Sequence, residues 1–282
     1  MTRRISIVAD AVSPGAVELL ASALRDQSQP GKKNWFWQKR QPSELLKYDI
    51  DVLVLLPDGV SRDEELAAAR RIGHCADSKD AAPFFKRFDL HSVTKEGASI
   101  YCLQDILSLV DGDWILFVPD MTYFWQEFLY AVIVGHWKKG FDVLIPEFRV
   151  RYPPIVAEGQ RAAYGRDGRE VHSRLGKDSC GPLGFLLDND CDEEVWEDEN
   201  RFPDPVYCAS YSRSFLRERG GLTRLDHAHL MLTAFSVGIM PEHVIHLALP
   251  WNESLLRCKN SAKNQVQGKR PPFVKMSRPW FG

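Results

Sequence analysis

Residues 112–122, Gly-Asp-Trp-Ile-Leu-Phe-Val-Pro-Asp-Met-Thr, decide how the rest of the chain is interpreted. The five apolar residues 114–118 are too few for a typical helix and are bounded by Gly and Pro, so they predict a strand buried on both faces of a parallel sheet. Asp120 follows directly, where open α/β sheets place their ligands. The alternative is that Asp120 only caps a helix starting near Phe124, and this stretch alone does not choose between the two.

The composition is that of an ordinary globular protein. Of the 282 residues, 44% are hydrophobic and 26% are charged, which excludes disordered and fibrous classes. A net charge of −2 argues against a general nucleic-acid-binding protein, so no nucleic-acid partner is expected. The absence of a signal-peptide core and of a membrane-spanning run predicts a cytoplasmic location. The six cysteines lack zinc-ligand or C-x-x-C spacing, which predicts free structural thiols.

Strand-like and helix-like patterns alternate along much of the chain. Strands are expected at 5–9, 51–56, 114–118, 141–145 and 244–249, and helices over 64–72, around 100–110, over 125–136 and over 214–219. Ser13-Pro14 predicts one more helix, with Ser13 as its N-cap and Pro14 at its first position. A further helix is expected from Asp226, with Leu230, Met231, Ala234 and Phe235 as its buried stripe and Gly238 as its end. Alternation of this kind predicts a mostly parallel sheet with helices on both faces.

Three segments lack this periodicity. Residues 151–203 form a long irregular region, and such loops are usually lids or binding loops. Within it, Asp188-Asn189-Asp190 has ligands for a hard cation, although a solvated acidic face is the favoured interpretation. Residues 31–40 mix basic and aromatic side chains, which suits a membrane surface, single-stranded nucleic acid or, favoured here, a surface loop with its aromatics packed inward. Residues 257–282 carry seven Lys or Arg and no acid, typical of a solvated tail or a cover for an anionic ligand.

Polar motifs stand at the ends of several expected elements. Leu56-Pro57-Asp58-Gly59-Val60-Ser61 ends the second strand, as Asp120 ends the strand at 114–118. The latter part of the chain adds Arg213, Gly220-Gly221, Asp226-His227-Ala228-His229-Leu230, Gly238 and His246. Each motif also has a purely structural interpretation, because Asp58-Gly59 makes a good turn, Asp226 a good helix cap and His246 a satisfied core histidine.

The order and spacing of these motifs resemble the nucleotide-sugar-dependent glycosyltransferases with the A-type fold, most closely the large inverting glycosyltransferase family 2. The resemblance covers residues 4–250 and implies one Rossmann-like, mostly parallel sheet flanked by helices, with 151–203 as an irregular insertion and 251–282 as a basic tail. The family's Asp-x-Asp metal motif is reduced here to Pro119-Asp120-Met121, and its Glu-Asp pair is replaced by Asp226-His227.

The resemblance also implies roles for individual residues. Nucleotide contacts are expected from Ala9, Asp58, Gly59 and Asp120, a metal site from Asp120 and His246 with His243 behind it, and the catalytic base from Asp226 or His227. The implied cofactor is Mn²⁺ or Mg²⁺, held weakly and only together with the nucleotide. The chemistry supports this arrangement, because a departing nucleoside diphosphate develops negative charge and the acceptor hydroxyl needs a base on the opposite face of the sugar.

The resulting hypothesis is a glycosyltransferase that moves a sugar from a nucleotide sugar donor to a glycan or lipid-linked acceptor with inversion, as in polysaccharide biosynthesis. Peripheral membrane association remains open. A nucleotidyltransferase of related topology is disfavoured, because residues 10–15 lack the Gly-rich, Lys-containing loop usual in such enzymes. The alternative from another class is an inactive transferase-like domain that binds a glycan or a protein.

Overall fold

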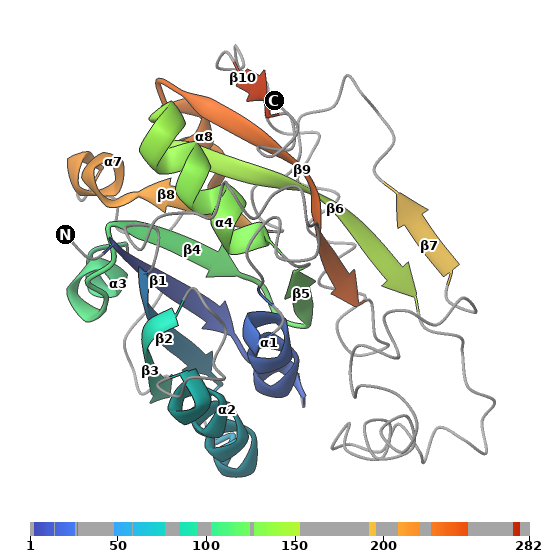
Figure 1. Ribbon diagram of the computed structural model, residues 1–282. Coiled ribbons are helices and arrows are strands. Elements are labelled where there is room, and N and C mark those ends of the chain that lie inside the picture. Colours follow the sequence, from blue (N-terminus) through green and yellow to red (C-terminus); the bar gives the residue numbers. More distant parts are fainter. Residues whose placement is uncertain are drawn as a thin grey trace, which may run out of the picture.

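The computed structural model describes residues 3–13, 15–25, 27, 48–57, 59–76, 85–94, 103–124, 127–152, 192–195, 208–219, 227–247 and 273–276. In this part of the chain one sheet carries helices on both faces (Figure 1). No helix within these ranges is long and apolar enough to span a membrane. The predicted α/β class, with a mostly parallel sheet between helices, is confirmed.

The elements follow the expected alternation. The strands are β1 (Arg3–Asp10), β2 (Tyr48–Leu56), β3 (Phe85–Thr94), β4 (Trp114–Val118), β5 (Thr122–Phe124), β6 (Val143–Tyr152), β7 (Asp192–Val195), β8 (Ala209–Ser212), β9 (Val237–Leu247) and β10 (Phe273–Lys275). The helices are α1 (Ala16–Arg25), α2 (Asp63–Ala76), α3 (Leu103–Leu109), α4 (Phe128–Ile133) with the π-helix η3 (Val134–Lys138), α7 (Arg213–Glu218) and α8 (His227–Leu232).

The sheet order is β10-β9-β6-β8-β4-β1-β2-β3. Strands that follow β1 in the chain are added first on one side of β1 and then on the other, so the strand order reverses at β1. The chain builds β2 and β3 outward on one side of β1 and then returns to place β4 on the other side, with β1 parallel to both β2 and β4. The two neighbours of β1 are thus reached in opposite directions, and open α/β sheets bind their ligands at the carboxyl ends of the strands at such a point. Beyond β4, β8 runs antiparallel and joins β4 to β6.

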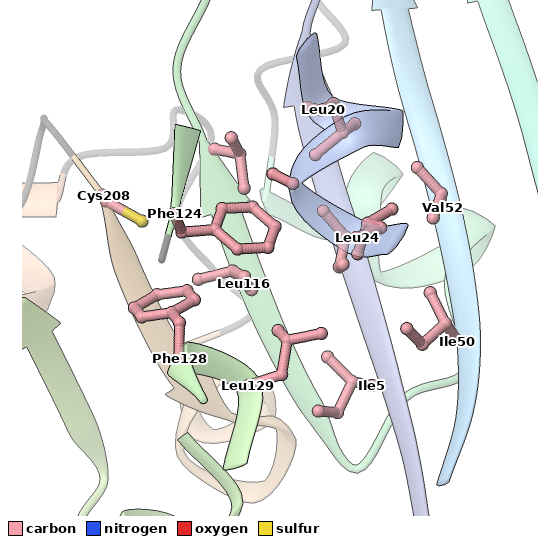
Figure 2. Close-up of a cluster of buried hydrophobic side chains, with 14 of the residues drawn as sticks. Ile5, Leu20, Leu24, Ile50, Val52, Leu116, Phe124, Phe128, Leu129 and Cys208 are labelled. Carbon is pink, nitrogen blue, oxygen red and sulfur yellow. The ribbon is translucent and has the colours of Figure 1, made fainter. Parts of the chain in front are cut away.

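Strand β4 lies at the centre of the core, as its apolar run predicts. All five of its residues are buried, and alternate side chains enter two separate clusters on the two faces of the sheet. On the face covered by α1 and α4, Leu24, Phe124 and Phe128 surround Leu116 (Figure 2). On the other face, Phe117 packs in a cluster with residues of α3, α7 and α8. A strand apolar at every position is therefore explained by burial from both sides.

Several sequence-based assignments are wrong. Asp120 leads into the short strand β5 and not into a helix near Phe124, and the helix begins only at Phe128. Strand β3 was not predicted, because it pairs on one side only with β2 and its exposed positions are polar. Helix α8 ends at Leu232, so Phe235 is not part of its buried stripe and is 79% exposed.

Gly238 is a second correction to the expected end of α8. It lies inside β9, where it pairs with Leu144 of β6 and does not terminate a helix. A Cβ atom at this position would come within 2.7 Å of Leu144 Cδ2 and 2.8 Å of Phe141 Cδ2. The glycine therefore permits the close packing of Leu144 and Phe141 over β9. The strand expected at 244–249 in fact begins at Val237 and ends at Leu247.

Parts of the segments expected to be irregular belong to the sheet. Residues 192–195 form β7 and pair antiparallel with the extended end of β6, and residues 273–275 of the basic tail add β10 beside β9. The predictions for 31–40 and 188–190, and for the rest of the insertion and tail, lie outside the described residues. Cys208 is a buried, free thiol whose pKa burial raises, as expected of a structural cysteine.

His136 forms a buried polar link near the amino end of β4. Its Nδ1 donates to the carbonyl of Phe141 at 2.7 Å, so its Nε2 is the nitrogen that accepts from the Ser210 hydroxyl at 2.8 Å in the neutral ring. The ring also stacks on Trp114. Burial lowers the pKa of His136 to about 4, against a smaller opposing effect of the Phe141 carbonyl.

The lowered pKa of His136 predicts an acid-sensitive fold. The folded state favours the neutral ring, so this stabilisation is complete above the unfolded pKa of 6.5 and is lost as the pH falls from 6.5 towards about 4. Urea unfolding at pH 7 and at pH 4.5 should therefore show a larger loss of stability in the wild type than in His136→Gln. Equal losses in the two proteins would remove His136 as a source of the acid sensitivity.

Candidate functional site

The candidate site lies at the carboxyl ends of β1, β2 and β4, where the order of the sheet reverses. Three connections meet at this edge, namely the loop 11–15 after β1, the turn 57–62 after β2 and the turn 119–121 after β4. The Ala11 amide donates to the Leu55 carbonyl at 3.0 Å, which continues the pairing of β1 with β2 into the first loop. The edge therefore presents loop residues on a rigid base of parallel strands.

Asp120 and Ser13 join two of these connections across the switch point. The Ser13 amide donates to both carboxylate oxygens of Asp120, at 3.1 and 3.2 Å, and the Ser13 hydroxyl donates to Asp120 Oδ2. Ser13 is 1% exposed, whereas Asp120 is only partly buried. Ser13 was expected to cap α1, and the structure directs its hydroxyl to Asp120 instead. The arrangement fixes the orientation of a carboxylate at the ligand edge.

The loop after β1 is also held from α2. Glu65 accepts from the amides of Gly15, at 3.0 Å, and Val17, at 3.3 Å, while Arg62 Nη2 donates to the Val12 carbonyl at 3.0 Å. Arg62 Nε lies 3.7 Å from Glu65 Oε1, and the two side chains are only 15% and 10% exposed. The loop that carries Ser13 is therefore anchored on both sides of this residue.

His246 is joined to β5, the strand that follows Asp120. Residue Thr122 pairs with His246 in the antiparallel β5–β9 ladder, and its hydroxyl lies 2.8 Å from His246 Nδ1. Both side chains are buried, at 3% and 1% exposure. Between Asp120 and Thr122 the chain turns sharply, with Met121 in the left-handed region at a φ of 53°. The imidazole predicted to complete a metal site is thus hydrogen-bonded to Thr122, which follows Asp120 by two residues.

His227 lies on the other face of the sheet, at the first residue of α8. Its Nδ1 is 2.8 Å from the hydroxyl of Tyr211, a buried residue of β8. The ring packs edge-on to Phe117 in β4, with centroids 5.2 Å apart, and stacks on Tyr211 at 5.8 Å. Phe117 stands three residues before Asp120, so His227 is near the carboxyl end of β4. Asp226 lies outside the described residues.

The remaining nucleotide contacts expected from the sequence differ in their placement. Gly59 has a φ of +72°, and the Val60 amide donates to the Pro57 carbonyl at 3.2 Å, so the expected turn is present. Asp58 itself lies outside the described residues. Ala9 is 3% exposed and its methyl group packs in the core, so the residues that reach this edge of the sheet are 11–13, which follow β1.

The residues around Asp120 could bind a hard cation only if substrate phosphates supplied some of its ligands. Among the described residues, no three His, Cys, Asp or Glu side chains gather around one point. Mg²⁺ and Mn²⁺ commonly take one or two protein carboxylates and complete their shell with substrate phosphates and water. Asp120 offers one carboxylate, oriented by Ser13, and Thr122, two residues further along the chain, is bonded to His246. A single oriented carboxylate fits such an ion only when a diphosphate and water complete its shell.

Several residues of this site were not identified from the sequence. Ser13 gives the same signal as a helix cap, and Tyr211 reads as an ordinary strand residue, so neither had a sequence signature. Thr122 was identifiable, because a motif that begins at Asp120 and keeps Asp-x-Asp spacing has its third position there. Arg62 and Glu65 look like a solvated first helical turn, and only the contact between α1 and α2 gives them a role.

Comparison with known proteins identifies distant structural similarity only. No protein-family model matches the chain, and no curated sequence matches it significantly. Similar solved structures are glycosyltransferases of the A-type fold. They include S. aureus TarS 1–349 in complex with UDP-GlcNAc, with 12% identity, 86% of this chain and 58% of that chain covered, and a TM-score of 0.47.

Two further structures come from other organisms. The mannosyltransferase PcManGT from Pyrobaculum calidifontis, in complex with GDP-Man and Mn²⁺, has 13% identity, coverage of 96% and 67%, and a TM-score of 0.48. Glucosyl-3-phosphoglycerate synthase from Mycobacterium tuberculosis, in complex with Mn²⁺, UDP-glucose and phosphoglyceric acid, has 13% identity, coverage of 95% and 81%, and a TM-score of 0.41. At these identities and TM-scores the likeness concerns the fold and not the activity.

Proposed function

We propose that this protein is an inverting glycosyltransferase that moves a sugar from a nucleotide sugar to a glycan or lipid-linked acceptor. The observation that carries the proposal is the position of Asp120, whose carboxylate Ser13 orients at the reversal point of the sheet. Parallel α/β sheets bind ligands at this point. A fixed carboxylate there, with His227 packed on Phe117 of the same strand and His246 bonded to Thr122 two residues further on, suits a donor that carries a diphosphate.

The donor occupies the side of the site near β1 and β2. Asp58 and the Gly59 turn accept from the base or ribose, and Asp120 faces the ribose or the diphosphate. Asp120 and His246 are the residues that would hold a divalent ion accompanying the nucleotide, and such an ion would supply positive charge for the diphosphate leaving group. Basic residues of the tail, from Lys259 to Arg278, share that neutralisation.

The acceptor approaches from the side of α8. Inversion needs a base on the face of the sugar opposite the leaving group, and Asp226 or His227 at the start of α8 supplies it. For His227 to act as the base, its Nδ1 donates to the Tyr211 hydroxyl oxygen, so that Nε2 carries the lone pair that takes the acceptor proton. Phe117 and Tyr211 hold the ring in place, so that its orientation does not depend on the acceptor.

An inactive transferase-like domain is the second candidate. The observations that favour it are the reduced metal motif Pro119-Asp120-Met121, which keeps one carboxylate, and Thr122, whose hydroxyl engages His246. A hydroxyl is a weaker ligand for a hard cation than a carboxylate. This candidate keeps nucleotide or glycan binding and loses turnover, so binding and turnover must be measured separately.

Nucleotide binding is tested by thermal denaturation with UDP, GDP, ADP and their sugar conjugates, with and without manganese. A ligand at a hundredfold excess over its dissociation constant stabilises the native state by roughly 2.7 kcal/mol, which raises the melting temperature by about 5 °C or more. We expect one nucleotide to produce this shift, and to do so more strongly with manganese. If none of these compounds moves the transition, the proposed donor site is wrong.

Asp58→Ala should weaken binding of that nucleotide and leave the fold intact, because a carboxylate in an edge turn contributes hydrogen bonds and not packing. Calorimetry measures the affinity, and the melting temperature without ligand reports on the fold. Ser61→Ala, in the same turn, is the matched control, since its hydroxyl is already bonded to Asp63 at 2.6 Å. Unchanged affinity in a folded Asp58→Ala protein would remove this residue from the site.

A further inference from the structure

The loop 12–15 is clamped by two charged residues that the proposed chemistry does not use. Arg62 immediately precedes α2 and Glu65 lies in its first turn, and both side chains are largely buried against the loop. Long charged side chains lose conformational freedom and hydration when they are held in this way. Their hydrogen bonds go to the backbone of Val12, Gly15 and Val17, so the two side chains fix the position of this loop.

Glu65 also places a negative charge at the N-terminus of α1. The amides of Gly15 and Val17 are of the kind that bind phosphate groups at helix N-termini in many nucleotide-binding folds. Here both donate to the Glu65 carboxylate, so a phosphate would have to displace an internal anion. The helix end nearest the switch point is therefore closed to the diphosphate of a donor.

The hydrogen bonds of Arg62 and Glu65 also determine where Ser13 lies. Arg62 fixes the carbonyl of Val12 just before it, and Glu65 fixes the amide of Gly15 two residues after it. Ser13 then directs both its amide and its hydroxyl to Asp120. A continuous series of contacts thus runs from α2, which follows the Asp58 turn, through the first loop to the carboxylate at the end of β4.

We propose that Glu65 is a positioning residue of the donor site, which sets the orientation of Asp120 through Ser13 and keeps phosphate away from the N-terminus of α1. The role of Asp120 in this inference rests on the proposed function. The exclusion of phosphate from the N-terminus of α1 does not rest on the proposed function, because it follows from the hydrogen bonds of Glu65 alone.

Hydrogen exchange and phosphate binding test the clamp without any nucleotide. In Glu65→Ala and in the milder Glu65→Gln, exchange at the amides of Gly15 and Val17 should quicken at least severalfold, and inorganic phosphate should raise the melting temperature. In the wild type and in Glu64→Ala, an exposed neighbour on the same helix, phosphate should have no such effect. Unchanged exchange in both Glu65 variants, or equal stabilisation of the wild type by phosphate, would overturn the closure.

Nucleotide affinity then tests the positioning role. Both Glu65 variants should bind the nucleoside diphosphate about tenfold more weakly, as is typical when a supporting residue of a binding group is lost. Combining Glu65→Gln with Ser13→Ala should add little further loss, because both changes release the same carboxylate. Faster exchange with unchanged affinity would refute positioning, whereas a wild type that binds no nucleotide would refute the proposed function and leave the closure standing.

Discussion

Asp120→Asn should lower turnover by roughly a hundredfold to a thousandfold, the usual cost of removing a group that stabilises developing charge. The amide has no charge to offer a cation, and its nitrogen cannot accept from the Ser13 amide or hydroxyl. In the wild type, manganese should produce little heat alone and bind measurably once a nucleoside diphosphate is present. In Asp120→Asn this coupling should be absent.

Asp113→Asn is the matched control for Asp120→Asn. Asp113 precedes β4 as Asp120 follows it, and its carboxylate accepts from the Arg4 amide at 3.2 Å at the opposite edge of the sheet. This variant should keep the coupling between manganese and nucleotide. Tight manganese binding to the nucleotide-free protein that survives Asp120→Asn would contradict the account and direct attention to Asp188 and Asp190.

Removal of the base should have the second large effect. Alanine at Asp226 or His227, whichever takes the acceptor proton, should lower turnover by roughly a hundredfold to ten-thousandfold and leave donor affinity nearly unchanged. A histidine base loses activity below about pH 6.5, whereas an aspartate base keeps it down to about pH 5. Full turnover in both alanine variants would mean that the base lies elsewhere or that the reaction retains configuration.

Tyr211→Phe separates the two candidate bases. It removes the hydroxyl that lies 2.8 Å from His227 Nδ1 and leaves the aromatic ring, which packs in the core. If His227 is the base, the acidic limb of the pH–rate profile should move in this variant. If Asp226 is the base, the limb should stay in place, and any loss of activity should be the same at every pH.

The elements read correctly from the sequence are those with a purely local signal. Strand β4 is apolar at each position because both faces are covered, and the buried runs of β1 and β2 are also mostly apolar. The errors arise where a distant partner decides the outcome. Strand β3 is polar because it lies at one end of the sheet order, and residues 237–240 enter β9 only because β6 lies beside them.

In the candidate site, too, the predictable residues have a local sequence signal, and the others are placed by distant contacts. Asp120 and the Asp58-Gly59 turn were predictable, because a polar residue directly after a buried strand marks the ligand edge of a parallel sheet. The contact of Ser13 with Asp120 spans 107 residues, and that of Thr122 with His246 spans 124. Both depend on strand register, which no local pattern encodes, so the hydrogen bonds that orient the site emerge only from the fold.

The central claim is turnover of a nucleotide sugar at this site, and the most direct measurement is release of nucleoside diphosphate from a panel of nucleotide sugars. The account predicts slow release from at least one donor by the wild-type protein, faster with manganese and lost in Asp120→Asn. Release that persists unchanged in Asp120→Asn would contradict the site, and nucleotide binding with no release from any donor, even when candidate glycan acceptors are added, would contradict the enzyme and identify a binding domain.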